Sequence, residues 1–298
     1  MRWTRSGLTL LRALIFILLP LFATGCLPEE ESDDIVNDQG ETVSDPTLRL
    51  NGMWNGQLDQ AGALRVLMYN GTVFAFDESV GFYGTVALDD DTATAELLLS
   101  AYDYTSSDTG ANQYVAGGAP EDYVLSGLLY PTQNDDDTLV GDYDSGTAPG
   151  GFALRNDGTW DTNSRLATLK GKWTSSGYEL YLTEVADELS FREVSVATPA
   201  TGCTTRGTIR ILNEEINLYT VQLTERKNCP GFNVTNAPGY ASVNANGELE
   251  LFLRKGEELL YARYTSTSAS GTTTDTTGDG TGDTTEETTG EETTEAAE

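Results

Sequence analysis

The residue types that could do chemistry in this chain are carboxylates and cysteines. Its 298 residues include 47 Asp and Glu, three Cys and no His. The lack of histidine excludes Ser-His-Asp and Cys-His nucleophile systems, HExxH zinc chemistry and every imidazole acid or base. No residue is singled out as catalytic, cofactor-binding or metal-binding. We therefore expect a protein that is not an enzyme and that needs no cofactor.

Runs of carboxylates are the one feature that suggests a metal. They offer the hard oxygen ligands that calcium prefers, and they lie at residues 89–91, 135–137 and 275–283. None has EF-hand spacing, and consecutive Asp residues in a turn point apart. We interpret them as solvated charge in turns and in a tail, with weak calcium binding as the alternative.

The first 26 residues have the pattern of an export signal. Arg2, Arg5 and Arg12 give a positive start, residues 8–22 are mostly apolar, and Ala23-Thr24-Gly25 lead directly into Cys26. The run is shorter than the roughly 20 apolar residues of a membrane span, and Pro20 interrupts it. We expect cleavage. The alternatives are a secretory signal cut near Ala23, or an uncleaved anchor.

This boundary resembles the lipobox of bacterial lipoproteins, with Ala23 where Leu is usual. The resemblance implies that Cys26 becomes the first residue of the mature chain and carries acyl groups such as palmitate. Several acyl chains hold a protein firmly, because each buried methylene contributes about 0.8 kcal/mol. By resemblance to Gram-negative lipoproteins, Leu27 favours the outer membrane. The expected location is the cell envelope, lipid-anchored and facing the periplasm or the cell surface.

Charge limits the partners of the mature chain. Without residues 1–25 it has 14 basic against 47 acidic residues, a formal charge of −33. Such a chain is repelled by nucleic acid and by anionic lipid headgroups. We therefore expect the membrane to be contacted through the acyl groups on Cys26, and we expect no nucleic-acid partner.

Composition and an internal repeat predict the domains. Residues 26–46 and 266–298 are acidic, have no basic residue and contain little to bury, which predicts a disordered lipidated tether and a disordered tail. Between them, residues 50–54, 83–88 and 95–102 resemble residues 169–173, 206–211 and 217–224, in the same order. A period this long implies two whole domains. The predicted divisions are a signal peptide at 1–25, the tether, two β-domains at 47–160 and 161–265, and the tail.

Each copy has apolar residues at every second position, as in half-buried antiparallel strands. In residues 248–254, for example, Leu249, Leu251 and Leu253 share one face and Glu250 lies on the other. About eight strands are predicted per copy, and in the first they lie near residues 53–58, 63–69, 72–77, 80–88, 93–104, 122–130, 138–144 and 150–155. One helical turn is predicted at 163–169. The fold class is all-β, with two tandem antiparallel barrels or sandwiches.

Gly-x-Trp begins the first strand of both copies, at Trp54 and Trp173. This resembles the lipocalin and calycin barrels, in which the Trp plugs the closed end, and also a group of uncharacterised envelope lipoproteins with duplicated Gly-x-Trp. The latter resemblance implies no activity. We expect a binding or structural module that contacts an envelope protein or a small apolar ligand. The alternatives are a histidine-free carboxylate glycoside hydrolase, which needs only two suitably placed carboxylates, and a lipocalin-like carrier of a small apolar ligand.

Cys203 and Cys229 remain once Cys26 is acylated. They flank the predicted hairpin made by residues 207–212 and 218–224, and the envelope outside the inner membrane is oxidising. The outer ends of a hairpin return to the same place, so a bridge is geometrically natural. The sequence predicts a disulfide. A redox-active pair would need Cys-x-x-Cys spacing or a neighbourhood that stabilises a thiolate.

Overall fold

The computed structural model describes residues 34–36, 42–59, 62–108, 112–131, 137–196 and 202–267. The chain forms two compact units, Met1–Asp45 and Pro46–Glu298. In the first unit, β1 (Asp34–Val36) and β2 (Thr42–Ser44) pair antiparallel within the segment predicted as a tether. Strand-favouring Ile35 and Val43 lie opposite each other in this pair. The signal peptide, Cys26 and the tail beyond residue 267 lie outside the described residues.

The second unit begins with a closed antiparallel barrel. In the described residues, eight strands form this ring, and the pairing of the last strand with the first closes it. The predicted strand positions are confirmed. In ring order the strands are β3 (Gly52–Leu58), β4 (Ala63–Tyr69), β5 (Thr72–Phe76), β6 (Val80–Asp89), β7 (Thr94–Asp108), β9 (Glu121–Tyr130), β10 (Thr138–Asp144) and β11 (Pro149–Asn156).

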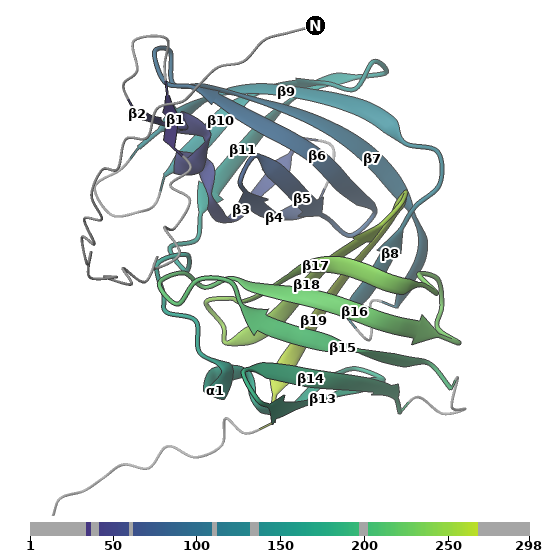
Figure 1. Cartoon of the computed structure of the whole chain (residues 1–298). Coiled ribbons are helices and arrows are strands. Elements are labelled where there is room, and N and C mark those ends of the chain that lie inside the picture. Colours follow the sequence, from purple (N-terminus) through teal and green to yellow (C-terminus); the bar gives the residue numbers. More distant parts are fainter. Residues whose placement is uncertain are drawn as a thin grey trace, which may run out of the picture. The chain divides into compact units, whose positions relative to one another are not determined.

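A second ring of eight described strands follows, closed by pairing between its last and first strands. Figure 1 shows the first ring in purple to teal and the second in green to yellow. The expected all-β fold class is confirmed, and of the two expected architectures, barrel or sandwich, both rings are barrels. The strands of the second ring are β12 (Gly171–Ser175), β13 (Tyr178–Val185), β14 (Glu188–Ser195), β15 (Thr204–Ile211), β16 (Tyr219–Lys227), β17 (Thr235–Val243), β18 (Glu248–Lys255) and β19 (Glu258–Ser266).

The two barrels begin in the same way. A 3-10 helix, η1 (Pro46–Leu50), precedes β3, and a short α-helix, α1 (Leu166–Leu169), precedes β12. The indole of Trp54 donates to the carbonyl of Leu50 at 3.0 Å, and that of Trp173 donates to Leu169 at 2.7 Å. The three pairs of similar segments fall on the first, fourth and fifth strands of the two rings. No helix in the described part of the chain is long and apolar enough to span a membrane.

Apolar side chains fill the interiors of the barrels and also the contact between them. One buried cluster belongs to the first barrel and another to the second. A third joins the outer faces of both barrels, and its buried members are Met53, Leu67, Phe74, Phe76, Tyr102, Tyr114, Ala116, Leu218, Phe252, Leu259 and Tyr261. The outer faces of several strands are therefore as buried as their inner faces.

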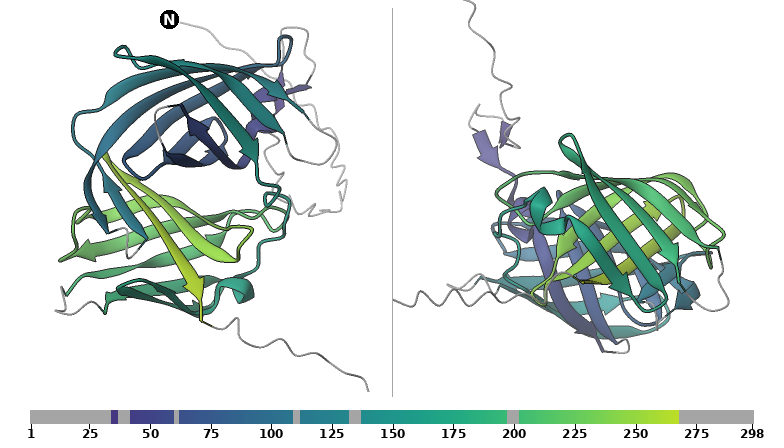
Figure 2. Two further views of the ribbon diagram at one scale, coloured as in Figure 1. Left: turned by 180° about the vertical axis from the view of Figure 1, so that it is seen from behind. Right: turned by 90° about the horizontal axis from the view of Figure 1, so that it is seen from below.

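A short strand that the sequence did not predict links the barrels. β8 (Gln113–Ala116) pairs with β7 of the first barrel and with β19 of the second. Its Val115 packs into the core of the second barrel, and its Tyr114 packs between the barrels. Figure 2, seen from behind, shows β19 in yellow reaching from the second barrel toward the strands of the first. β8, which follows β7 of the first barrel in the chain, is thus an additional strand paired with β19 of the second.

Candidate functional site

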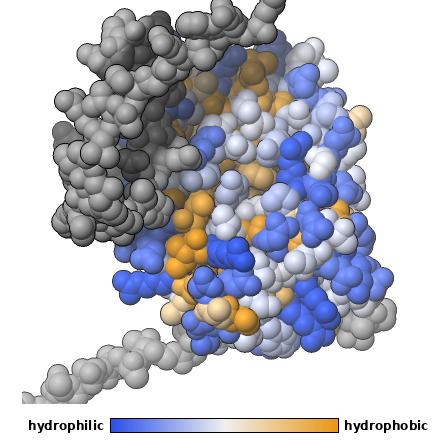
Figure 3. Space-filling model, in the orientation of Figure 1, coloured by the Kyte–Doolittle hydropathy of each residue, from blue (hydrophilic) through white to orange (hydrophobic). Residues whose placement is uncertain are grey.

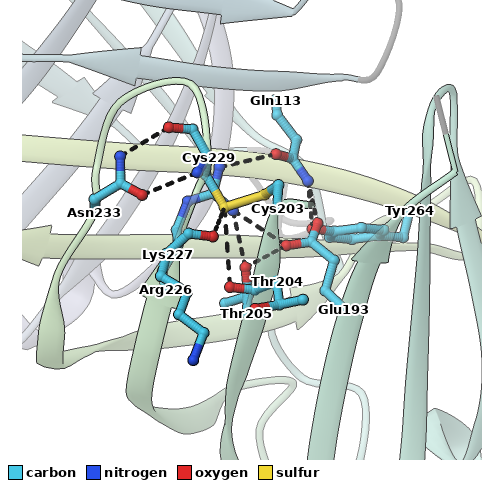
Figure 4. The surroundings of a disulfide bond; sticks show 10 residues. All are labelled: Gln113, Glu193, Cys203, Thr204, Thr205, Arg226, Lys227, Cys229, Asn233 and Tyr264. Carbon is cyan, nitrogen blue, oxygen red and sulfur yellow. Dashed lines mark hydrogen bonds and ion pairs between the residues drawn. A yellow bond between two sulfur atoms is a disulfide. The ribbon is translucent and has the colours of Figure 1, made fainter. Parts of the chain in front are cut away.

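The predicted disulfide is present between Cys203 and Cys229, so this prediction is confirmed. The two cysteines lie just beyond the paired ends of β15 and β16, where Thr204 lies opposite Lys227. Asn233 holds the turn that follows, because its amide accepts from the Cys229 N–H at 2.9 Å and donates to the Cys229 carbonyl at 2.7 Å. Figure 4 shows this arrangement. The bridge closes one end of the hairpin.

A buried ion pair lies beside the disulfide (Figure 4). Arg226 Nη1 lies 3.1 Å from Glu193 Oε2, and the two side chains are 1% and 2% exposed. The same carboxylate accepts from Thr205 at 2.5 Å and from the Tyr264 hydroxyl at 2.6 Å. Gln113 of β8 also donates to Glu193 and accepts from Arg226 Nη2 at 3.2 Å. This buried network connects the linking strand to the second barrel.

A second ion cluster lies where the barrels meet. Arg65 of β4 donates to Asp157 at 2.6 Å and to Glu250 of β18 at 2.6 Å, and Tyr261 donates to Glu250 at 2.7 Å. Burial opposes the charge of Arg65, but the two carboxylates outweigh it and raise the pKa of Arg65. Burial, and then Glu250, raise the pKa of Tyr261 well above its usual value. The sequence placed Glu250 on the polar face of its strand, whereas it is 1% exposed because Arg65 pairs with it across the barrels.

The carboxylate runs do not gather into a metal site in the described part of the chain. Asp89 accepts from the backbone N–H groups of Asp91 and Thr92, at 3.0 and 3.3 Å, and so holds its own turn. Asp90 pairs with Arg49 at the surface. Most of the run at 135–137 and the whole run at 275–283 lie outside the described residues.

An open cavity of about 690 Å³ lies between the two barrels, and we call it the inter-barrel cleft. Its volume falls in the range of small-molecule sites. Its walls come from the outer faces of β5 and β6 on one side and of β15 to β18 on the other. The lining residues are Thr72, Phe74, Tyr83, Thr208, Arg210, Thr220, Val221, Gln222, Pro238, Gly239, Tyr240, Arg254, Lys255 and Gly256.

Strand alternation explains why this wall is polar. In β15, Ile209 points into the barrel core, so Thr208 and Arg210 lie on the outer face. Across the sheet, Arg210 lies opposite Thr220, which lies opposite Tyr240, which lies opposite Phe252. Phe252 belongs to the apolar cluster between the barrels. The outer face of the second barrel therefore changes from polar to apolar along this row of paired residues. The cleft lies where the polar residues give way to apolar ones.

Five lining hydroxyl groups are free of partners within the described protein, those of Thr72, Thr208, Thr220, Tyr83 and Tyr240. None of their oxygens is buried without a partner, so water reaches them. Burial, with Tyr69 and Tyr83 nearby, raises the pKa of Tyr240, which keeps this hydroxyl protonated. These groups can both donate and accept hydrogen bonds. The cleft therefore offers a ligand many polar contacts that the protein does not use itself.

Among the described residues, three cations and no carboxylate line the cleft. The Arg254 guanidinium stacks over the Tyr83 ring, 3.9 Å from its centre, and no ion pair to Arg254 occurs among the described residues. Its buried Nε also lacks a hydrogen-bond partner. Arg210 pairs with Glu188 at 2.7 Å, and Lys255 donates to the carbonyl of Asn236 at 2.9 Å. Among the described residues, Arg254 is thus the lining cation that has neither an ion pair nor a hydrogen bond.

Comparison of the chain with protein-family models, curated proteins and solved structures finds no match. The geometry of the molecule is therefore the basis for proposing a function.

The sequence did not indicate the cleft. Its residues come from six strands and one turn, and most are ordinary outward-facing residues of their own strands. Val221 is an exception, because it belongs to the core of the second barrel. On the face drawn in Figure 3, hydrophilic residues cover much of the visible surface and hydrophobic residues form smaller groups. A cluster of Tyr, Thr and Arg on such a surface has no distinctive sequence pattern. The one available signal was Tyr and Arg at outward positions of an acidic chain.

Proposed function

We propose that this protein is a lipid-anchored binding protein of the cell envelope that takes its ligand in the inter-barrel cleft. The observation that carries the proposal is the set of unpartnered hydroxyls in the described protein, together with the unpaired Arg254, in a cavity of about 690 Å³. Acyl groups on Cys26 would hold it at the outer membrane, as the lipobox resemblance implies. The acidic remainder of the chain would keep it soluble beside the membrane.

The proposed site differs from that of a lipocalin. A lipocalin-like carrier would hold its ligand inside a barrel, but both interiors contain packed apolar clusters. Leu97, Phe82 and Val66 are among the buried residues of the first, and Phe191, Leu223 and Leu251 are among those of the second. The space between the barrels is the better candidate, and its polar lining favours a polar ligand over an apolar one.

The hydrolase alternative has less support. It needs two carboxyl groups facing a substrate about 5 to 10 Å apart. Asp157 and Glu250 approach each other through Arg65, but both are paired with that guanidinium and are nearly buried. In the part of the chain that the structure describes, the cleft lining has no carboxylate. We therefore propose binding without catalysis.

Native mass spectrometry of the protein purified gently from envelopes tests the proposal, through a retained ligand. Thr220→Trp places a bulky side chain in the cleft, at a strand position where Trp is well tolerated. Thr224→Trp is the matched control, because Thr224 is an exposed residue of the same strand outside the cleft. Ligand lost from the first variant and kept by the second supports the proposal. Ligand kept by both contradicts it.

A further inference from the structure

We propose that the inter-barrel cleft binds a short glycan segment that carries an isolated acidic group, such as a carboxylate. This inference rests on the proposed function and specifies its ligand class. Three properties of the cleft lead to it: its hydroxyl-rich wall, its aromatic wall and its unpaired arginine.

The hydroxyl wall matches a polyhydroxylated ligand. Thr208 and Thr220 lie on neighbouring strands, and Gln222 lies opposite Thr208. On the other side of the cleft, the Thr72 and Tyr83 hydroxyls are equally without partners in the described protein. A sugar presents several hydroxyls, each of which both donates and accepts, and so can satisfy such groups together. An apolar ligand would instead leave them desolvated and unpaired, at a cost.

The aromatic wall supplies the apolar contact that a sugar ring needs. Phe74 forms the floor, with Tyr83 edge-on to it at 5.0 Å and Tyr240 edge-on at 6.2 Å between ring centres. Tyr240 also packs against Tyr69 at 5.6 Å. These contacts fix both tyrosines, so little side-chain entropy remains to be lost on binding. Aromatic rings with polar ends suit ligands that have one apolar face and a polar rim.

Arg254 supplies the acid preference. Stacking on Tyr83 holds its guanidinium flat, and no carboxylate of the described chain neutralises it. A planar guanidinium with free N–H groups is suited to binding a carboxylate. Arg210 and Lys255 add positive charge at the same wall. The cleft is therefore a local cationic site on a strongly acidic protein.

The surrounding charge limits the ligand to a short segment with few acidic groups. A mature chain with 14 basic and 47 acidic residues repels an extended polyanion. One acidic group reaching Arg254 gains the local attraction without much of that repulsion, because separated exposed charges are screened beyond about 10 Å in ordinary buffer. A densely charged polymer such as nucleic acid is disfavoured for the same reason.

Calorimetric titration of the mature protein with defined trisaccharides tests the inference. The acidic probes are 3′-sialyllactose and an aldotriouronic acid, which each carry a single carboxylate. The neutral counterparts are 2′-fucosyllactose and xylotriose. We expect at least one acidic probe to bind about 10-fold or more tightly than its neutral counterpart. This factor corresponds to one charge-assisted hydrogen bond at a partly exposed site.

Variants assign that preference to the cleft. Arg254→Gln should remove the roughly 10-fold preference, and Arg254→Lys should retain part of it because the charge remains. The control, Arg165→Gln, makes the same change at an exposed arginine outside the cleft and should have no effect. Thermal melting of each variant shows whether its fold is intact.

The outcomes separate the ligand class from the site. If the neutral and acidic probes bind equally and Thr220→Trp abolishes the binding of both, the acidic preference is overturned while the cleft is supported as the site. Acidic binding unchanged in both Arg254→Gln and Thr220→Trp would place the site elsewhere and contradict both proposals. Binding of none of the four probes would overturn the glycan inference, and the retained-ligand experiment would then judge the cleft by itself.

Discussion

Replacing Arg226 by Leu should strongly destabilise the protein, because it breaks the buried ion pair beside the disulfide. Arg226 and Glu193 are 1% and 2% exposed. Removing the guanidinium leaves a carboxylate that the interior cannot hydrate. Breaking a buried pair in this way costs about 3 to 5 kcal/mol. Glu193 keeps hydrogen bonds from Thr205, Gln113 and Tyr264. We therefore expect a loss of about 3 kcal/mol in the free energy of unfolding.

The second replacement, Glu193→Gln in the Arg226→Leu background, should recover much of this loss. It removes the unpaired charge but keeps the shape of the side chain and an acceptor for its neighbours. A matched control is Arg192→Leu, which makes the same change at an exposed arginine of β14, next to Glu193 in the sequence. Exposed substitutions of this kind usually change stability by about 0.5 kcal/mol or less.

Urea unfolding of the four proteins, followed by circular dichroism, measures these differences at pH 7. We expect a large loss for Arg226→Leu, a partial recovery in the double variant and little change in the control. A loss for Arg226→Leu no larger than that for Arg192→Leu would contradict this expectation. So would a double variant less stable than the single one, since the cost would then lie in lost packing rather than in an unpaired charge.

Three further predictions concern the anchor, the disulfide and the buried tyrosines. Cys26→Ser should release the protein from membranes or leave it unprocessed, and a fatty-acid label incorporated equally by wild type and variant would contradict this. Replacing both Cys203 and Cys229 by Ser should lower the free energy of unfolding by about 3 kcal/mol on the loop-entropy model, and a urea midpoint equal to that of the wild type would refute it. Burial and neighbouring carboxylates raise the pKa of Tyr261 and Tyr264 well above 10, the usual value. A raised pKa means that the stability these tyrosines contribute is present below pH 10 and is lost as the pH rises above it. Absorbance at 295 nm should therefore show both tyrosines ionising together with alkaline unfolding. Ionisation of both near pH 10 while the fold stays intact would contradict this prediction.

The strands and the disulfide were predictable because local pattern determines them. Alternation of apolar and polar residues located the strands of the first barrel to within a few positions. The Gly-x-Trp repeat placed equivalent strands, and the two indoles make the same hydrogen bond four residues back. By contrast, β8 has only four residues, Gln113–Ala116, and all four are buried. A run this short has no periodicity to detect.

The contact between the barrels was less predictable, although it left a trace in the sequence. The segments Val66-Leu-Met68 and Val73-Phe-Ala-Phe76 are apolar at every position, so both faces of these strands had to be covered. The apolar pattern does not identify the residues that cover the outer faces of these strands, because the partner residues, Phe252 and Tyr261, are distant in the chain. The same limit applies to Arg65 and Glu250, which are separated by 185 positions. The cleft is a product of this contact and has no local signal of its own.

Hydroxyl-radical footprinting of tyrosines most directly tests the claim that a ligand occupies the inter-barrel cleft. Protein purified gently from envelopes would be compared with the same protein after unfolding and refolding, which removes bound ligand. We expect Tyr83 and Tyr240 to be protected in the first sample. Tyr130 and Tyr181, which are 51% and 41% exposed outside the cleft, should react equally in both. Equal oxidation of Tyr83 and Tyr240 in the two samples would contradict that claim.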